Sequence, residues 1–352
     1  MAFLYILIFL VAVSGNVLVI YVVLSNKKMQ TVTNLFITNL ALSDLMIDLT
    51  SLWITPGYIY IGRWVFGNPM CHALPFVQAF SIFISTLTLT AIAVDRYLVI
   101  VHNSQSMSLT DHMSMRRCLM IIAGIWVVSF IPAFPYGYFM KTRDIDICDL
   151  TICNEAWTDD YTRKYYGWIV LLLQFAVPFS IIGVSYRRIW TFLANRRWAS
   201  ERTVEAARRK RLLSMLIIMV MLFAICWIPT NAMNIARDLR LISSNLNFTF
   251  YFLITHIIAM TATCWNPIIY AWMNESLREE FIRAIPIIRH RVPSAARIKM
   301  ISECKPATNR TNCLDAPSLS TRSGSRQMSR QFETVLYNQD PRNGDSPETT
   351  LL

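Results

Sequence analysis

Seven long apolar runs, separated by short polar segments, constrain what this 352-residue chain can fold into. A helix needs roughly 20 predominantly apolar residues to cross about 30 Å of hydrocarbon. The runs that meet this length are residues 2–25, 31–60, 70–94, 118–140, 165–186, 212–236 and 246–273. Only 16% of the residues are charged, whereas soluble domains carry about 25%. The pattern predicts an all-α membrane protein in which residues 1–273 form a seven-transmembrane helix bundle.

The two ends of the chain depart from this pattern in different ways. The first run begins at the first residue and is too long for the core of a cleaved signal peptide, so we expect a spanning helix, with the short N-terminus fitting a truncated form. Residues 274–284 place Leu277, Phe281 and Ile282 on one side of a helix, which predicts a short amphipathic eighth helix on the membrane lipid. Residues 285–352 are polar and rich in Ser, Thr, Arg and Pro, which predicts a disordered cytoplasmic tail.

The distribution of charge predicts the orientation in the membrane. If the helices alternate in direction, the basic clusters after the first, third and fifth runs fall on one side, and such loops mark the cytoplasmic side. The loop at 141–164 lies on the opposite side and holds six acids and four bases. We therefore expect a multi-pass plasma membrane protein with an extracellular N-terminus and a cytoplasmic C-terminus. The net charge of +11 then reflects topology and not nucleic-acid binding.

Asp95-Arg96-Tyr97 ends the third run at its cytoplasmic side. An arginine beside an acid at the membrane face can hold a charge pair in one state and offer its fork of donors to a partner in another. An ordinary cluster of charges at a helix end is the alternative. The other motifs favour the functional interpretation.

Two of the prolines in the spanning runs lie beside motif residues. Pro229 lies two residues after Trp227 in the sixth run, and Pro267 follows Asn266 in the seventh. Proline removes a backbone hydrogen bond and kinks a helix, and a kink beside a bulky side chain makes a two-state element. A purely structural kink is the alternative. The residues assigned to this switch are Phe223, Trp227, Pro229, Asn266, Pro267 and Tyr270.

Carboxylates occur in the second run alone among the seven, as Asp44 and Asp48. An ionised group in hydrocarbon is costly, so Asp44 is either neutral and hydrogen-bonded or part of a cation or proton site. We favour such a site, because intramembrane acids are rarely incidental. The residues that would share it are Asn16, Ser85 and Asn266.

Three cysteines fall on the side expected to be extracellular. Cys71 begins the third run, and Cys148 and Cys153 lie in the 141–164 loop. An oxidising exterior permits either loop cysteine to bridge to Cys71. The spacing of the eight cysteines does not suggest a zinc site, and we expect no metal or cofactor apart from a cation near Asp44.

In this order and at these helix positions, the motifs resemble the rhodopsin-like G-protein-coupled receptors over residues 1–284. The matching segments are Gly15-Asn16-Val17, Leu40-Ala41-Leu42-Ser43-Asp44, Trp64-Val65-Phe66-Gly67, Cys71, Asp95-Arg96-Tyr97, Trp126, Pro178, Tyr186, Phe223 to Pro229 and Asn266 to Tyr270. The resemblance implies a receptor that is no enzyme, a sodium ion near Asp44, and a disulfide between Cys71 and Cys153 with Cys148 as the competitor.

The same resemblance implies the cytoplasmic partners. The residues that would contact a heterotrimeric G protein are Asp95, Arg96, Tyr97 and Tyr186. Serines and threonines between 318 and 329 offer sites for receptor kinases, and the phosphates would form the anionic patch that arrestin binds.

Two departures qualify the resemblance. Relatives often carry an asparagine where this chain has Ala262, so the sodium site loses one partner. Many relatives also carry an acid near the start of helix six to pair with Arg96, where this chain has Arg208-Arg209-Lys210-Arg211. We therefore expect no ion pair between Arg96 and the sixth helix. Without that restraint we expect some signalling in the absence of ligand.

The residues expected in the extracellular half of the bundle select among receptor branches. A bioamine receptor would carry an aspartate at Gln78, and an opsin would carry a lysine at Met260, so both interpretations fall away. The set that resembles the peptide pocket of the neuropeptide Y branch is Thr55, Gln78, Glu155, Asp238 and His256. Ligands of that branch end in Arg-Phe-amide or Arg-Tyr-amide, and the branch usually couples to the inhibitory class of G protein.

The chemistry of this set fits an amidated peptide. A C-terminal amide is neutral, and Thr55, Gln78 and His256 can match its donors and acceptors. Asp238 can pair with the peptide's arginine, and the acidic loop would attract a cationic ligand. Taken singly, Asp238 also fits a solvated loop acid, and His256 a packed histidine. Short neuropeptide F, tachykinin-like and other amidated peptides are the alternative ligands.

Two other classes of protein compete with a peptide receptor. A transporter or channel would show pore-lining charges or paired broken helices in two halves, and the sequence shows neither. A scaffold that binds peptide without signalling would not need the intact Asp95-Arg96-Tyr97 and Asn266 to Tyr270 motifs.

Overall fold

The computed structural model describes residues 2–102, 113–145, 150–195, 204–241 and 246–284, all of them within one compact unit, Met1–Arg291. The predicted tail at 285–352, with its phosphorylation sites, lies outside the described residues, and so does Cys148. The side chains of residues 204–209, which include Arg208 and Arg209, are also outside the described part.

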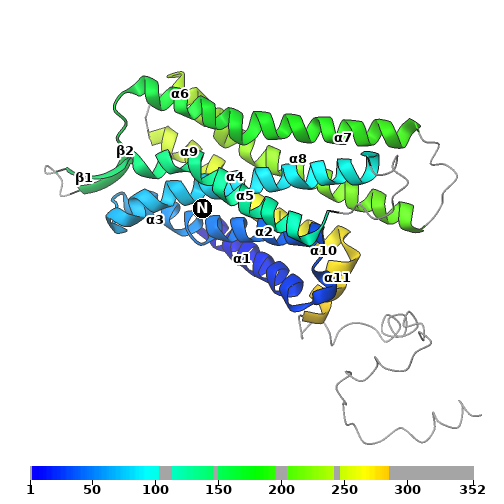
Figure 1. The fold of residues 1–352 in the computed structure, drawn as a ribbon. Helices are drawn as coiled ribbons and strands as arrows, with labels where there is room; N and C mark the ends of the chain where they lie inside the picture. The colour runs from blue at the N-terminus through cyan, green and yellow to red at the C-terminus, as the bar shows by residue number, and fades with distance from the viewer. Residues whose placement is uncertain (1, 103–112, 146–149, 196–203, 242–245, 285–352) are drawn as a thin grey trace, which may run out of the picture. The chain divides into compact units, whose positions relative to one another are not determined.

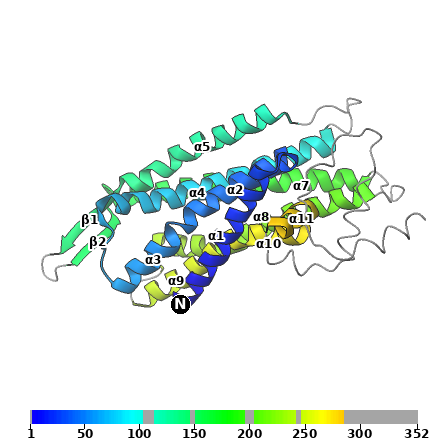
Figure 2. The same ribbon diagram turned by 90° about the horizontal axis from the view of Figure 1, so that it is seen from below.

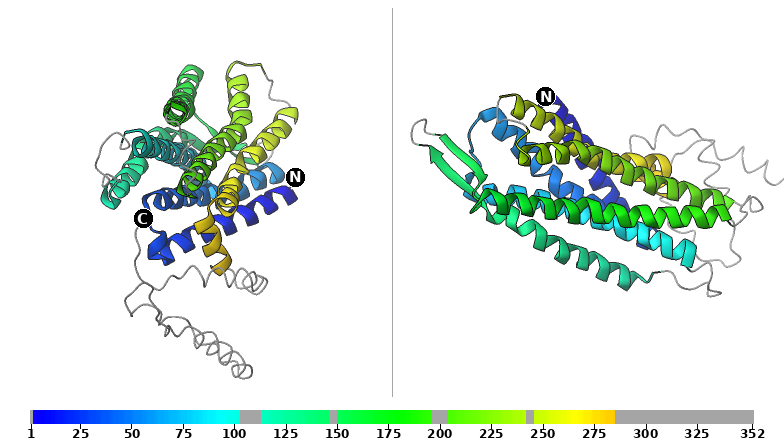
Figure 3. Two further views of the ribbon diagram at one scale, coloured as in Figure 1. Left: turned by 90° about the vertical axis from the view of Figure 1, so that its right-hand side faces the viewer. Right: turned by 90° about the horizontal axis from the view of Figure 1, so that it is seen from above.

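Seven helical spans in the described part are long and apolar enough to cross a membrane, which confirms the predicted bundle (Figure 1). The spanning helices run side by side (Figure 3). In chain order, the helices are α1 (Ala2–Ser25), α2 (Val32–Asp48), α3 (Ser51–Ile61), α4 (Gly67–Tyr97), α5 (Met115–Tyr138), α6 (Asp160–Leu171), α7 (Val177–Asn195), α8 (Val204–Asp238), α9 (Leu246–Met260), α10 (Ala262–Met273) and α11 (Glu275–Ala284).

Three of the spans are interrupted. The second breaks between α2 and α3, the fifth contains a π-helical segment at Leu172–Ala176, and the seventh breaks between α9 and α10. At both breaks a threonine hydroxyl donates to the preceding turn, from Thr50 to the Met46 carbonyl and from Thr261 to the Ile258 carbonyl, each at 2.7 Å. Such side-chain bonds help to satisfy the backbone of an irregular helix where no water is present.

The central helix of the bundle is α4. In the most apolar part of its span 67% is buried, against 22% for the α5 span. Helix α5 packs against α4 at the edge of the bundle (Figure 2), and its exposed side chains include Val127 and Ile131. Exposed apolar side chains are expected where lipid, and not water, surrounds a helix.

A buried amide joins three helices near the middle of the bundle. Asn39 of α2 donates from Nδ2 to the Thr88 hydroxyl of α4 at 2.8 Å, and its Oδ1 accepts from the Trp126 indole of α5 at 2.8 Å. Both polar ends of the buried Asn39 side chain are therefore paired, as a buried amide requires.

A two-stranded antiparallel hairpin lies at one end of the bundle (Figure 1). Strand β1 (Met140–Ile145) pairs with β2 (Leu150–Glu155), with Met140 opposite Glu155. The predicted all-α architecture did not include these strands. An isolated two-stranded hairpin is marginally stable in water, so its presence depends on contacts with the rest of the fold.

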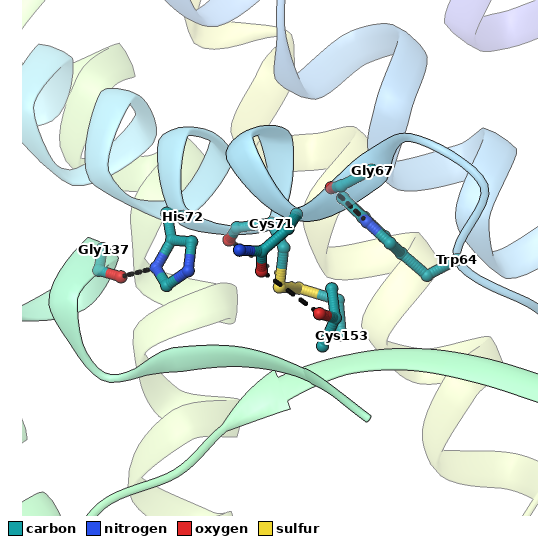
Figure 4. Close-up of a disulfide and its surroundings, with 8 residues drawn as sticks. Trp64, Gly67, Cys71, His72, Gly137 and Cys153 are labelled. Atoms are coloured by element: carbon teal, nitrogen blue, oxygen red, sulfur yellow. Dashed lines mark hydrogen bonds between the residues drawn. A yellow bond between two sulfur atoms is a disulfide. The ribbon is translucent and has the colours of Figure 1, made fainter. Parts of the chain in front are cut away.

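Contacts with the start of α4 and with the residues just before it hold the hairpin, and Figure 4 shows the disulfide among them. A disulfide joins Cys153 of β2 to Cys71 of α4, which confirms the expected pairing. The Trp64 backbone N–H donates to the Thr151 carbonyl at 2.7 Å, and the Trp64 indole donates to the Gly67 carbonyl at 2.8 Å. The hairpin is thus anchored beside the helix that forms the centre of the bundle.

The opposite end of the bundle carries the end of α4 and the short helix α11. Leu277 and Phe281 of α11 are buried against the bundle, and the Asn274 side chain accepts a hydrogen bond from the Leu277 N–H at 3.2 Å. We call the end that carries β1 and β2 the hairpin end, and the end at which α4 finishes the Arg96 end. The two ends define where the candidate functional residues gather.

Candidate functional site

A cavity of about 620 Å³ opens at the hairpin end. Three of the five residues predicted to bind a ligand line it: Thr55 of α3, Gln78 of α4 and Glu155 of β2. The cavity volume lies within the range of about 300–1,000 Å³ that ligand sites show. Asp238 and His256 are not among the lining residues, so the structure gathers part of the predicted set around one space.

The two neutral members of the set lie on neighbouring helices. Gln78 accepts a hydrogen bond at its Oε1 from the Ser51 hydroxyl of α3 at 3.3 Å. This bond helps to orient the carboxamide, whose NH₂ group can donate to a ligand. Thr55 lies one turn along α3 from Ser51 and adds a hydroxyl to the same wall.

Asp238 lies behind the cavity wall, at the end of α8. Its Oδ1 is 2.8 Å from Arg163 Nη2 of α6 and 3.7 Å from Arg237 Nε. Both arginines line the cavity. The sequence predicted Asp238 at the end of the sixth span, which is α8, but did not predict Arg163 as its partner. The two residues come together only when α6 lies beside α8 in the fold.

The start of α6 is fixed by Asp159, which accepts hydrogen bonds from the Thr162 N–H at 2.6 Å and from the Thr162 hydroxyl at 2.7 Å. An aspartate in this position satisfies free N–H groups of the first turn. These hydrogen bonds hold the pKa of the Asp159 carboxyl below its ordinary value. The cap therefore sets where Arg163, one residue further along α6, stands against α8.

His256 of α9 lies deeper than the cavity wall. Its side chain is buried, its Nδ1 is 2.9 Å from the Tyr5 hydroxyl of α1, and its ring stacks with Phe252 at a centroid distance of 5.7 Å. Phe252 does line the cavity. The Nε2 atom of His256 is buried without a hydrogen-bond partner among the described residues, so its role in binding stays a prediction.

Glu155, the acid among the lining residues, lies at the end of β2. Its Oε2 accepts a hydrogen bond from the Trp157 indole at 3.2 Å, and that indole stacks on Phe139 with ring centroids 4.0 Å apart. These contacts hold Glu155 at the rim of the cavity, where it remains largely exposed.

The predicted switch residues of the sixth span, which is α8, lie in an aromatic cluster below the cavity. Trp227 and Phe223 of α8 have ring centroids 6.1 Å apart, and each lies 6.4 Å from Phe175 of the π-helical segment. The Trp227 indole N–H is buried without a hydrogen-bond partner among the described residues. The ring can therefore change position without breaking a hydrogen bond of its own.

Polar side chains of α1, α2 and α10 form a buried cluster in the middle of the bundle. Asn266 donates to Asp44 at 2.8 Å, Thr263 donates to Asp48 at 2.8 Å, and Asn16 donates to the Thr263 carbonyl at 3.1 Å. The structure thus places Asp48 and Thr263 in one cluster with Asn16, Asp44 and Asn266, which were predicted to share a cation site. Ser85 lies beside this group with its hydroxyl bonded to Ser43 at 2.9 Å.

Two oxygens of this cluster are buried without a hydrogen-bond partner among the described residues: Asn16 Oδ1 and Asp48 Oδ2. Carboxylate, amide and hydroxyl oxygens are the ligands that hard cations prefer. The sequence showed Asp48 as a second acid, but its partner Thr263 lies 215 residues away, so sequence spacing gave no signal that they share a site.

At the Arg96 end, the arginine is held by two partners. Arg96 Nη2 donates to the Asp95 carboxylate at 2.6 Å and to the Thr33 hydroxyl at 2.6 Å. The hydroxyls of Tyr186 and Tyr270 are buried without a hydrogen-bond partner among the described residues. Arg96 is therefore engaged within its own helix and with α2, and the neighbouring Tyr186 keeps a hydroxyl that has no partner among the described residues.

A second ion pair at this end was not expected from the sequence. Arg211 of α8 pairs with Glu275 of α11, and its Nη2 donates to the Trp272 carbonyl at the end of α10 at 3.1 Å. At the Arg96 end, Arg211 thus ties α8 to the end of the seventh span, and no ion pair joins Arg96 to the described side chains of α8.

Comparison with known proteins finds similarity to seven-transmembrane receptors. The model of the family described as 7 transmembrane receptor (rhodopsin family) matches residues 15–270. Neuropeptide Y receptor type 2 of mouse is 36% identical over 287 residues, which cover 79% of this chain and 74% of the relative. The human receptor of that name is 36% identical over 285 residues, covering 79% and 74%, and the pig receptor is 35% identical over 308 residues, covering 85% and 79%.

Proposed function

The chain belongs to the rhodopsin family of seven-transmembrane receptors, and from that premise we propose that it binds an amidated neuropeptide ending in Arg-Phe or Arg-Tyr and activates a G protein of the inhibitory class. At the coarser level it is a multi-pass plasma membrane receptor of the neuropeptide Y receptor type, and not an enzyme. The peptide, the coupling class and the orientation are the proposed parts.

The cavity at the hairpin end is the observation that carries the proposal. It brings Thr55 and Gln78, two neutral hydrogen-bonding groups, to one wall, which suits the neutral amide at the end of such a peptide. The hairpin end would then be extracellular, where the Cys71–Cys153 disulfide meets an oxidising environment.

The peptide's arginine would pair with Asp238. This carboxylate lies directly behind Arg163 and Arg237 of the cavity wall. A guanidinium and a carboxylate can form two parallel hydrogen bonds, which gives both energy and orientation. Glu155 at the rim of the cavity adds a second negative charge that favours a cationic ligand.

The Arg96 end would be cytoplasmic and would take the G protein. The residues proposed to contact it are Asp95, Arg96, Tyr97 and Tyr186. The free hydroxyls of Tyr186 and Tyr270 support a rearrangement at this end, because they can accept new partners when Arg96 leaves Thr33. Receptor kinases and arrestin would act on the tail beyond residue 284.

A sodium ion is proposed in the polar cluster of α1, α2 and α10. The free oxygens Asn16 Oδ1 and Asp48 Oδ2 fit a hard cation, and Asp44 lies one helical turn from Asp48. Two carboxylates one turn apart in a membrane are costly unless a cation or a proton compensates their charge. The site would therefore draw on Asp48 as well as on Asp44.

The test of the proposal compares two variants and two peptides in cells with a G-protein activation readout. Asp238→Ala is expected to weaken an Arg-Phe-amide peptide by about 2–5 kcal/mol, as for a buried charge pair. The matched control is Asp160→Ala, which removes an acid that is 72% exposed and pairs with Arg240 at the same end.

A peptide with citrulline in place of the arginine separates charge pairing from other effects. If Asp238 binds the arginine, the citrulline peptide loses little potency when Asp238 is replaced. Equal losses for both peptides, or an equal effect of the two acid replacements, would contradict the assignment. Amidated peptides of other classes, tested in the same cells, decide between this ligand and the alternatives.

A further inference from the structure

The ion pair between Arg163 and Asp238 occupies the acid to which the ligand's arginine is assigned. Arg163 Nη2 lies 2.8 Å from Asp238 Oδ1, with the two side chains only 20% and 11% exposed. The pair joins α6 to the end of α8 at the hairpin end. A partly buried pair of this kind is screened less by water and salt than a surface pair.

The two arginines lie nearer to the cavity than the acid does. Arg163 and Arg237 line the cavity, and Asp238 does not. A guanidinium that enters the cavity therefore meets two other guanidinium groups before it reaches the acid. Binding through Asp238 requires that the nearer arginine give up its position.

The contact with Arg163 is not an aligned hydrogen bond, so Asp238 can still accept a hydrogen bond from a better-placed donor. Asp238 Oδ1 is buried, yet no hydrogen bond of acceptable direction reaches it from the described residues, in spite of the short distance to Arg163. Its other oxygen, Oδ2, faces the backbone of Gly167, where an added Cβ would lie 3.5 Å away. A pair that is close but poorly aligned is weaker than a bidentate one.

We propose that Arg163 is an internal substitute for the ligand's arginine, bound to Asp238 in the free receptor and displaced when the peptide binds. This inference rests on the proposed function, because it needs a ligand with an arginine. The exchange replaces one guanidinium by another, so the charge beside Asp238 does not change. The displaced Arg163 side chain, already one-fifth exposed, returns towards water.

The exchange predicts a measurable cost in affinity. A ligand that must first displace an internal partner binds only the fraction of receptors in which the site is free, and its apparent affinity falls by that fraction. Removing the internal partner should therefore raise affinity. For Arg163→Gln we expect a gain of about three- to fivefold for an Arg-Phe-amide peptide, because a poorly aligned pair contributes about as much as the stronger surface ion pairs.

The matched control is Arg240→Gln. Arg240 lies at the same end and pairs with Asp160 at 3.4 Å, but both side chains are more than 70% exposed, and Asp238 is untouched. Each variant removes one positive charge at the hairpin end, but Arg163 lines the cavity whereas Arg240 is exposed, so the repulsion of a cationic peptide falls more with Arg163→Gln. Arg163→Gln is therefore also made together with Asp238→Ala, where competition for Asp238 is absent. The part of the gain that disappears in the Asp238→Ala background isolates the competition for Asp238, and a gain that persists there would overturn the proposal.

The experiment measures binding of the arginine peptide and of its citrulline counterpart to the full chain in membranes, with surface expression recorded for each variant. The expected result is a gain with Arg163→Gln that exceeds the gain with Arg240→Gln, for the arginine peptide alone. A loss of affinity with Arg163→Gln, an equal gain in both variants, or the same gain for the citrulline peptide would overturn the proposal.

Failure of the proposed function gives a different result. If the unmodified receptor does not bind the arginine peptide, or binds it without dependence on Asp238, the assignment of the ligand is wrong and the inference falls with it. If the unmodified receptor binds it through Asp238 but the two arginine variants behave alike, the ligand assignment stands and only the internal substitution is wrong.

Discussion

The close contact between Gly15 of α1 and Pro267 of α10 leads to a prediction about folding stability that does not depend on any ligand. A Cβ added at Gly15 would lie 2.7 Å from Pro267 Cβ and 2.8 Å from Pro267 Cγ. The proline ring is closed onto its own backbone, so it cannot rotate out of the way as a flexible side chain would. Gly15→Ala therefore forces α1 and α10 apart by several tenths of an ångström.

The size of the effect follows from two opposing contributions. Overpacking in a well-packed interior costs about 1–3 kcal/mol, whereas alanine in place of glycine inside a helix favours the folded state by at most about 1 kcal/mol. The expected net loss is roughly 1–2 kcal/mol in the free energy of unfolding. For a chain of this size, at about 2.1 cal/mol/K of unfolding entropy per residue, that corresponds to a fall in Tm of about 1–3 °C.

The assay is thermal unfolding of the purified, detergent-solubilised receptor with a thiol-reactive dye. Among the described residues, the free cysteines Cys118, Cys226 and Cys264 are buried in the bundle, so their reaction reports loss of the fold. Cys148, Cys304 and Cys313, which lie outside the described residues, are replaced by serine in every variant. All variants are heated at one scan rate, because membrane receptors unfold irreversibly and an apparent Tm depends on that rate.

Two other helical glycines supply the matched control. A Cβ added at Gly124 of α5 or at Gly183 of α7 would meet no atom within 4 Å. Their alanine variants undergo the same chemical change without the clash, and their Tm should stay the same or rise slightly. If Gly15→Ala is as stable as these controls, the close approach of α1 to Pro267 does not carry the energy assigned to it.

Two further predictions concern contacts that hold helices together. Asn39→Ala should cost about 1–2 kcal/mol in unfolding free energy, because two buried hydrogen bonds are lost, and Trp126→Phe, which removes one of them, should cost about half as much in the same assay. Arg211→Ala should raise ligand-independent G-protein activation about two- to fivefold, since the exposed pair with Glu275 is worth about 0.2–1 kcal/mol; activation no higher than in the neighbouring variant Lys210→Ala would contradict a restraining role.

The sequence predicted the parts of the fold that depend on local composition. Apolar runs of sufficient length located all seven spans, because the cost of placing charge in hydrocarbon acts on each helix separately. The strands β1 and β2 were not predicted, since what holds them is the disulfide to α4 and the backbone bond from Trp64. The breaks at Thr50 and Thr261 were also missed, because neither residue interrupts the apolar pattern.

For the candidate site, the sequence indicated which side chains are charged but not which of them pair with each other. Side-chain type indicated that Asp238 would bind a guanidinium, and the structure does pair it with one, but the guanidinium is that of Arg163. The two residues are far apart in the chain and meet only through the packing of α6 against α8, so no spacing in the sequence could have paired them. A charge assigned to a ligand from sequence must therefore be checked against every internal group that can reach it. If Asp238 binds the ligand's arginine as proposed, the affinity of the site depends on the difference between that pairing and the pairing of Asp238 with Arg163.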